Sequence, residues 1–254
     1  MTDFSIVIPL YNEEECAQQS IQGILQALEG FCPGRYELIL VINGSTDRTG
    51  EICDGFARHF PQIKTLRSLQ NLGYGGGILR GLAHSKGTYC GFMCGDGQVA
   101  PETLIRVLNE LERGGLDLVK TTRVHRGDGT ARRFQSIAYN ELFQVLFGIQ
   151  SSDINAMPKM MRRDLLTQLG LEATDWFIDA EIMIKAHYAG LQVKEIPIEY
   201  LKRIGGSSAV RISTVFEFLR NALHLLASGK IHRWKQIRCV IRETEPMAVS
   251  GPPR

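Results

Sequence analysis

Short apolar runs alternate with helical patterns along the first half of the chain. The apolar runs predict strands over residues 4–9, 36–42, 63–66, 88–94 and 116–121. Apolar positions at helical spacing between these runs predict helices over 12–28, 47–59, 77–85 and 101–113. Strands that alternate with helices of this length are typical of βαβ units and a mainly parallel sheet. The carboxyl ends of such strands meet at one edge of the sheet, where α/β proteins bind ligands.

The pattern changes in the second half. Residues 132–148 have the spacing of an amphipathic helix, and residues 153–161 are expected to be extended. A helix is predicted over 177–189, with Gly190 at its end. Pro197 lies within a predicted strand over 192–200, which indicates an edge strand or a bulge. A loop and a further helix are expected within 206–228.

The composition is that of an ordinary globular chain. Of 254 residues, 44% are hydrophobic and 22% are charged, which suffices for one sizeable core and excludes collagen-like, disulfide-scaffold and disordered classes. The net charge of +2 is too small to imply a nucleic-acid partner, and none is expected. Residues 201–254 hold ten Lys or Arg against three Glu, so the basic charge is concentrated there.

Two further features bear on the cellular location. No apolar run approaches the ~18 residues that a membrane-spanning helix needs. The six cysteines show no CxxC spacing, which favours reduced thiols. We therefore predict a cytoplasmic protein.

Polar turns follow the first, second and fourth predicted strands. Residues 9–13 and 43–47 each open a helix, and we expect Ser45 or Thr46 to cap the second one. Either turn alone is an ordinary helix start, but together at adjacent strand ends they predict a ligand crevice. Asp96, after the fourth strand, can reach a hard cation or bond its own backbone in an Asp-Gly turn.

The sequence contains neither of two common nucleotide motifs. No GxxxxGK[ST] is present, so a P-loop is excluded. The glycines at 73 and 75–77 miss the spacing of a dinucleotide fingerprint, because Ile78 stands where its last glycine belongs. These glycines either let the chain pass close to another group or form a flexible loop before a helix.

Several motifs in order resemble a known family. The chain is similar to family 2 glycosyltransferases of the GT-A fold, most of all to the dolichol-phosphate (polyprenyl-phosphate) mannosyltransferase branch, over roughly residues 4–208. The motifs are SIVIPLYNEEE (5–15), NGSTDRT (43–49), NLGYGGGILRGL (71–82), GDGQVAPE (95–102) and FIDAEIMIKAHYAGLQVKEIPIEYLKRIGGSS (177–208). The resemblance implies an α/β GT-A domain with a nucleotide-sugar-binding half over 1–121 and an acceptor-side half over 122–208. A basic helical extension and flexible tail would follow over 209–254.

The resemblance also implies a nucleotide site. The second turn of the family normally carries two consecutive acids before Gly-Ser, whereas this chain has Ile42-Asn43, so the base of the donor stays open. The residues that match nucleotide-contacting positions are Pro9, Tyr11, Asn12, Glu13, Asn43, Gly73 and Gly75.

A divalent metal, Mg²⁺ or Mn²⁺, is implied as the cofactor. The family signature is Asp-x-Asp, often followed by x-Gln, and here Asp96 and Gln98 remain while Cys94 replaces the first acid. A thiolate is a soft ligand that suits these cations poorly, so we interpret Cys94 as a packed residue. The substitution keeps open the alternative of a module that binds nucleotide sugar without turnover.

On the acceptor side the resemblance implies phosphate-binding residues at Arg123, Arg132, Arg133 and Ser136, and a catalytic role for Arg203 beside the donor diphosphate. Asp179 and Glu181 are catalytic candidates as general base for a hydroxyl acceptor, although two positions apart on a helix they do not share a face. Residues 153–159 depart from the family form, so sugar specificity does not transfer.

The expected reaction is an inverting transfer from a nucleoside-diphosphate sugar to polyprenyl phosphate, or alternatively to a saccharide or small-molecule hydroxyl. Apolar positions at helical spacing between 215 and 226 stand beside the basic charge. They predict either a helix on the cytoplasmic face of a membrane or a helix packed on the domain or on a second subunit, as in a homodimer.

Overall fold

The computed structural model describes residues 2–125, 140–201, 212–229, 231 and 234. Strands and helices alternate through the first half: β1 (Phe4–Leu10), α1 (Ala17–Phe31), β2 (Tyr36–Asn43), α2 (Thr49–His59), β3 (Ile63–Ser68), α3 (Tyr74–Leu82), β4 (Tyr89–Phe92), α4 (Pro101–Glu112) and β5 (Leu118–His125). After a helical stretch over residues 140–147 come β6 (Lys159–Arg162), α6 (Arg163–Leu169), α7 (Ile178–Ala189), β7 (Val193–Glu199) and α8 (Ile212–Ala227).

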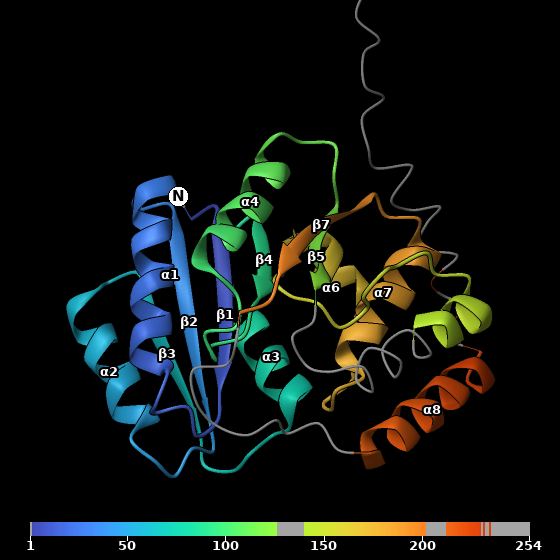
Figure 1. The fold of residues 1–254 in the computed structure, drawn as a ribbon, viewed down its shortest axis with the longest axis horizontal. Coiled ribbons are helices and arrows are strands. Elements are labelled where there is room, and N and C mark those ends of the chain that lie inside the picture. The colour runs from blue at the N-terminus through green and yellow to red at the C-terminus, as the bar shows by residue number, and fades with distance from the viewer. Residues whose placement is uncertain (1, 126–139, 202–211, 230, 232–233, 235–254) are drawn as a thin grey trace, which may run out of the picture.

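In the described part of the chain seven strands form one sheet, in the order β3-β2-β1-β4-β6-β5-β7. All neighbouring pairs are parallel except those of β6, which runs antiparallel to both β4 and β5. The carboxyl ends of β1, β2, β4, β5 and β7 therefore share one edge of the sheet, called here the rim. In Figure 1 the carboxyl ends of β1 and β2 lie at the bottom. The predicted mainly parallel α/β sheet is confirmed.

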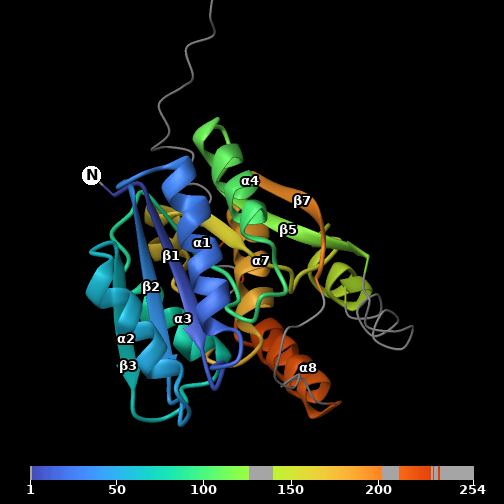
Figure 2. The same ribbon diagram turned by 60° about the vertical axis from the view of Figure 1, so that its left-hand side comes forward.

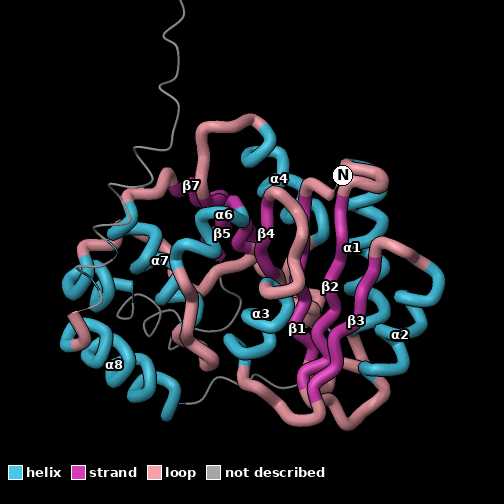
Figure 3. The backbone as a smooth tube through the Cα atoms, turned by 180° about the vertical axis from the view of Figure 1, so that it is seen from behind, coloured by secondary structure: helices cyan, strands magenta, loops and turns pink. Residues whose placement is uncertain are grey.

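Helices cover both faces of the sheet. One core contains Ile6, Ile8 and Leu40 with the apolar sides of α1, α2 and α4. The other contains Val7 and Val41 with α3, α6, α7 and α8. Alternate residues of β1 and β2 thus enter opposite cores, which is why these strands read as continuous apolar runs. In Figure 2 α1 lies in front of β1, and from behind, in Figure 3, α3 lies in front of the sheet.

Several predicted boundaries were wrong. Helix α1 begins at Ala17 instead of residue 12, because residues 11–16 form turns in which Asn12 has a φ of 52°. Helix α3 begins at Tyr74 instead of residue 77 and includes four glycines, which are buried against neighbouring segments. Only Lys159–Arg162 of the expected extended stretch 153–161 is a strand, and the short helix α6 that follows it was not predicted.

Other predictions for the second half are confirmed. Gly190 ends α7 in the left-handed conformation, with a φ of 71°. Pro197 lies in β7, the outermost strand, and β5 beside it carries a register irregularity between Arg123 and His125. Helix α8 is packed on the domain, since Ala222 and Leu225 are buried in the second core. No helix among the described residues is both long and apolar enough to span a bilayer.

Candidate active site

The turns after β1 and β2 are bonded to each other. The Asn12 backbone N–H donates to Ser45 Oγ at 3.2 Å, and the Thr46 N–H donates to Asn12 Oδ1 at 2.9 Å. Ser45 and Thr46 are thereby occupied, and the prediction that one of them caps α2 was wrong. Arg48 is the N-cap residue of α2 and makes no side-chain cap, while Asp47, one residue earlier, accepts the N–H of Thr49 at its Oδ1 at 3.0 Å.

This paired turn leaves one large side chain at the surface of the rim. Tyr11 is 48% exposed, whereas Pro9 and Glu13 are half-buried. The Glu13 N–H donates to Thr49 Oγ1 at 2.9 Å, and its carboxylate accepts the thiol of Cys16 at 3.1 Å. Of the predicted nucleotide residues in the first turn, Tyr11 and Asn12 are exposed at this place, whereas Pro9 and Glu13 are half-buried.

The Asn43 side chain holds the segment that precedes α3. Its Oδ1 accepts the Leu72 N–H at 3.0 Å, and its Nδ2 donates to the Gly73 carbonyl at 2.9 Å and to Asn71 Oδ1 at 3.2 Å. Asn43 is only 3% exposed. These bonds make Asn43 a positioning residue for the glycine segment in this structure, and a direct contact with a base stays a prediction.

The glycine segment passes close to protein. A Cβ atom at Gly73 would lie 2.5 Å from the Thr174 carbonyl oxygen, and one at Gly75 would lie 2.3 Å from that of Ala173. The Gly76 N–H donates to the Thr174 carbonyl at 2.9 Å. Of the two alternatives for these glycines, close passage is confirmed, and the neighbour is the backbone of residues 173–175. A nucleotide contact by Gly73 or Gly75 stays a prediction.

Asp96 lies on the turn after β4 and is partly accessible. Its Oδ1 accepts the Gln98 N–H at 3.1 Å, with Gly97 at a φ of +73° between them, so the Asp-Gly turn is present. Burial raises the pKa of the neighbouring Cys94 thiol well above its usual range, and the negative charge of Asp96 raises it further. Cys94 is therefore a neutral thiol, in agreement with its interpretation as a packed residue.

The donor set at this turn fits a divalent cation shared with a substrate. No group of three or more His, Cys, Asp or Glu side chains within the described ranges is placed to hold a metal by itself. Mg²⁺ sites that use substrate phosphates need only one or two carboxylates, and Asp96 provides one. Gln98, two residues further along and also partly accessible, carries a neutral amide oxygen.

Arg123 is paired with a carboxylate. Its Nε and one terminal nitrogen, Nη2, donate to the two oxygens of Asp153 at 2.5 and 2.7 Å. Its guanidinium lies 5.1 Å from the ring centroid of Tyr200. The N–H of Leu201 donates to the Gln98 carbonyl at 2.9 Å, which ties the end of β7 to the Asp96 turn. The other predicted basic and polar positions, Arg132, Arg133, Ser136 and Arg203, lie outside the described residues.

Asp179 and Glu181 are both buried and have different partners. Asp179 is 2% exposed and pairs with the ammonium of Lys159; burial raises the pKa of Asp179, while Lys159 opposes that rise. Glu181 is 4% exposed and accepts the backbone N–H groups of Glu172 and Ala173 at 3.0 and 2.8 Å. It also pairs with Lys185 at 2.6 Å. This geometry does not favour either residue as a free general base.

Four residues near the rim were not singled out from the sequence: Lys120, Lys159, Tyr74 and Trp176. Lys120 and Lys159 stand within apolar strand segments, and a charge there is itself a signal of a buried polar network. Tyr74 stacks on Trp176 with ring centroids 4.3 Å apart. No local pattern predicts that stack, because the two residues are about a hundred positions apart in the chain.

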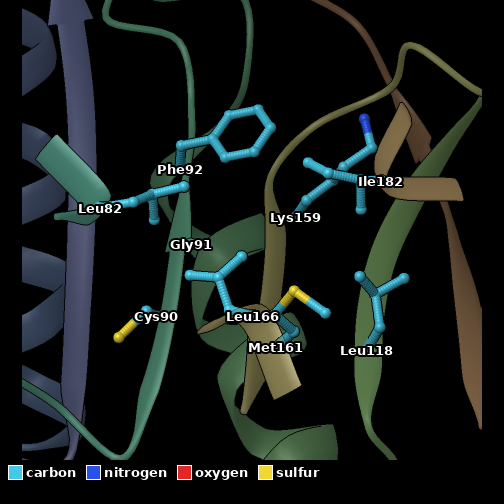
Figure 4. A pocket seen from close by; sticks show the side chains of 9 residues that line it. All are labelled: Leu82, Cys90, Gly91, Phe92, Leu118, Lys159, Met161, Leu166 and Ile182. Atoms are coloured by element: carbon cyan, nitrogen blue, oxygen red, sulfur yellow. The ribbon is translucent and has the colours of Figure 1, made fainter. Parts of the chain in front are cut away.

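A small void lies beneath the rim, between β4, β6 and β5. Figure 4 shows side chains such as Met161, Leu118 and Ile182 around it. The Lys159 nitrogen points to the end where Phe92 lies, 5.7 Å from that ring centroid. The lining is almost wholly apolar, so this void is part of the core and is not the ligand site.

Comparisons with known proteins identify the family of the chain. Residues 5–170 match the model of the family described as glycosyl transferase family 2. The chain is 28% identical over 235 residues to a dolichyl-phosphate beta-glucosyltransferase of Saccharomyces cerevisiae, covering 83% of this chain and 70% of the relative. It is 27% identical over 242 residues to a dolichol-phosphate mannosyltransferase of Pyrococcus furiosus, covering 90% of this chain and 65% of that relative.

Among solved structures, glucosyl-3-phosphoglycerate synthase from Mycobacterium tuberculosis in complex with phosphoglyceric acid aligns with a TM-score of 0.68 at 19% identity, covering 89% of this chain and 79% of that one. The same enzyme with Mn²⁺, uridine diphosphate and glucosyl-3-phosphoglycerate aligns with a TM-score of 0.62. These likenesses concern the fold. The match over residues 5–170 and the polar turns along one rim together show that the chain belongs to glycosyl transferase family 2 and has the GT-A fold.

Proposed function

We propose that this protein is an inverting glycosyltransferase that moves a sugar from a nucleoside-diphosphate sugar to polyprenyl phosphate. The observation that carries the proposal is that both candidate general bases are already bonded to other protein groups. The carboxylate of Asp179 is held by Lys159, and that of Glu181 by Lys185 and two backbone N–H groups. A hydroxyl acceptor needs a base to take its proton, whereas a phosphate acceptor is already an anion.

The names of the relatives support the same class of acceptor. Besides the two dolichyl-phosphate enzymes, the chain is 27% identical to a dodecaprenyl-phosphate galacturonate synthase of Rhizobium johnstonii. It is 30% identical to an undecaprenyl-phosphate 4-deoxy-4-formamido-L-arabinose transferase of Edwardsiella ictaluri. The sugars differ among these four names while a polyprenyl or dolichyl phosphate recurs, so the acceptor class is the better supported half of the proposal.

The chain's own residues supply binding and orientation. The paired turns with Tyr11 at the surface hold the nucleotide, and Asp96 with Gln98 holds a divalent cation, Mg²⁺ or Mn²⁺. When bound there, the cation neutralises the charge that develops on the leaving diphosphate. The bond between the anomeric carbon and the diphosphate oxygen breaks with its electron pair on the diphosphate. An oxygen of the acceptor phosphate forms the new bond on the opposite face of the sugar.

The test is a transfer assay with purified protein, Mg²⁺ or Mn²⁺, labelled GDP-, UDP- and dTDP-sugars, and undecaprenyl or dolichyl phosphate in detergent. Asp96→Ala is expected to lower the rate by about 10²–10³-fold, the usual loss for one such electrostatic stabiliser. Asp164→Ala is the matched control, because that carboxylate is 53% exposed and follows β6, whose carboxyl end lies at the opposite edge of the sheet. Wild-type turnover in Asp96→Ala would contradict the metal assignment, and transfer to saccharides alone would replace the acceptor.

A second candidate is a module that binds nucleotide sugar without turnover. The neutral thiol of Cys94 favours it, because that thiol leaves Asp96 as the lone acid of the motif. A thermal shift with a nucleotide sugar, together with no transfer and no donor hydrolysis, would support this reading.

Peripheral association with the cytoplasmic face of a membrane, and a homodimer, stay predictions. A polyprenyl acceptor resides in lipid, and Leu223 of α8 is 53% exposed beside the buried Ala222. Sedimentation with and without anionic lipid vesicles measures both properties.

A further inference from the structure

A row of charged side chains crosses the sheet just below the rim. Phe92 of β4 is paired in register with Lys159 of β6, Lys159 with Lys120 of β5, and Lys120 with Glu195 of β7. Residues paired in this way lie on the same face of a sheet. Lys120 is 0% exposed and Lys159 is 2% exposed. Two buried ammonium groups side by side are costly unless each is fully bonded, so the row calls for an explanation.

The Lys120 ammonium has three donors and three close acceptors. It lies 2.8 Å from the Thr121 carbonyl, 2.6 Å from the Asp153 carbonyl and 3.1 Å from Glu195 Oε1. An ammonium donates three hydrogen bonds and a neutral amine only two. Loss of one proton would therefore leave one acceptor unpaired and Glu195 without its opposite charge.

The same groups hold residues 151–153, called here the anchor loop. Glu195 accepts the Ser151 hydroxyl at 2.5 Å and the Ser152 N–H at 3.2 Å. Lys120 holds the third residue of the loop through its carbonyl. Asn140 also donates to the Ser152 carbonyl at 2.8 Å. The Lys120–Glu195 pair therefore bonds all three residues of the loop, through the Ser151 hydroxyl, the Ser152 N–H and the Asp153 carbonyl.

A continuous path of contacts leads from the anchor loop to the Asp96 turn. The Asp153 carboxylate grips Arg123, whose guanidinium lies over the Tyr200 ring. The residue after Tyr200, Leu201, donates its N–H to the Gln98 carbonyl. Movement of the loop would thus reach the site through side chains already in contact.

We propose that Lys120 is a positioning residue of the transfer reaction: with Glu195 it fixes the anchor loop, and through Arg123 and Tyr200 it sets the acceptor side of the rim against the Asp96 turn. The proposal rests on the proposed function, because it concerns sugar transfer at that site. Lys120 touches neither donor nor acceptor in this scheme.

The charge state of Lys120 provides a readout that a merely structural residue lacks. Burial, together with the charge of Lys159, lowers the pKa of Lys120 to about 8 against the opposing effect of Glu195. The anchor is then complete below this pH and is weakened as the pH rises through it. The charged groups that face this network from the surrounding elements are Arg123, Asp153, Lys159, Asp179 and Glu195.

The experiment compares wild type, Glu195→Gln and Glu199→Gln. Glu199 is an exposed acid of the same strand and serves as the matched control. For wild type we expect kcat to fall as the pH rises through about 8. Glu195→Gln removes the carboxylate that favours charged Lys120. The fall in kcat at high pH should therefore move to lower pH by about one unit. Glu199→Gln should leave the profile in place. Lys120→Met, if it folds, should lower kcat at least tenfold at neutral pH, within the ~10²-fold that misplacement can cost.

Hydrogen exchange gives a measurement independent of activity. The Ser152 N–H, which donates to Glu195, should lose protection in wild type over the same pH range and at lower pH in Glu195→Gln. The positioning role of Lys120 is contradicted, and the proposed function is not, by either of two results in a protein that transfers sugar. In the first, the fall in kcat at high pH occurs at the same pH in wild type and Glu195→Gln. In the second, kcat and the protection of the Ser152 N–H change at different pH. A wild-type protein that binds donor but transfers no sugar overturns the proposed function, and the positioning role falls with it.

Discussion

The Tyr74 ring lies nearly parallel to the Trp176 indole, with ring centroids 4.3 Å apart and planes 14° apart. Tyr74 is the first residue of α3, and Trp176 lies two residues before α7. The Tyr74 hydroxyl also lies 3.7 Å from the sulfur of Met157. The stack therefore joins the start of α3 to the segment before α7.

Loss of this stack should loosen that junction. We expect Tyr74→Leu to lower the free energy of unfolding by about 2 kcal/mol, from lost stacking and lost apolar contact. Tyr74→Phe keeps the ring and should stay within about 1 kcal/mol of wild type. Urea unfolding measures both variants, and equal stability of Leu and Phe at this position would show that the stack contributes little.

The close passage of Gly75 predicts a large effect from one methyl group. A Cβ there would lie 2.3 Å from the Ala173 carbonyl oxygen and 2.7 Å from that of Asp175. Because both neighbours are backbone atoms that cannot turn aside, we expect Gly75→Ala to cost about 1–3 kcal/mol in thermal unfolding. Gly30→Ala is the control: it has open space around it in α1 and should be neutral or stabilising by up to about 1 kcal/mol.

Substitution of the two acids of α7 separates structural from catalytic roles. Asp179→Asn leaves the buried Lys159 without its opposite charge, so we expect a loss of about 3–5 kcal/mol in stability. Glu181→Gln weakens the bonds to the 172–173 backbone and to Lys185, and should cost about 1–3 kcal/mol. The turnover of folded Glu181→Gln should be close to that of wild type. A hundredfold fall in its kcat at unchanged stability would identify Glu181 as a general base instead.

Acid sensitivity should depend on Glu37, a buried acid of β2. Burial alone would raise the pKa of Glu37, but bonds from Lys64, the Ser5 hydroxyl and the Lys86 N–H outweigh it and hold the pKa below its usual range. A lowered folded-state pKa contributes stability that is present above the unfolded value of about 4.3 and is lost as the pH falls below it.

Glu37→Gln should therefore lower stability at pH 7 and flatten the decline between about pH 4.5 and 3. Unfolding free energies measured across this range check the sign. If the variant and wild type lose stability in parallel on acidification, other carboxylates account for the loss of stability at low pH.

Much of the first half of the fold was predictable from sequence because its signals are local. The strands β1 and β2 are apolar on both faces, and Pro101 opens α4 in the position where its missing N–H costs nothing. The rim turns followed from the same reasoning, since parallel strands place their carboxyl ends together. Asp96 could be named for the same reason, whereas Gln98 was named from the family resemblance alone.

The hydrogen-bond partners of the rim residues could not be predicted from the sequence. Ser45 and Thr46 looked like helix caps, yet they bond a turn more than thirty residues away. Asn43 looked like a ligand residue, yet its amide holds residues 71–73. A polar side chain bonds whichever group the fold brings nearest, and its own position in the chain does not reveal that group.

The sequence by itself determined the strand order along the chain, the edge where polar residues collect and the family resemblance, because periodicity and motif spacing are written in neighbouring residues. Only the tertiary structure decided that Lys120 and Lys159 are buried side by side, that Arg123 is held by Asp153 and that the glycines face residues 173–175. Those pairings join residues far apart in the chain, and their energies depend on burial and distance, which exist only once the chain has folded.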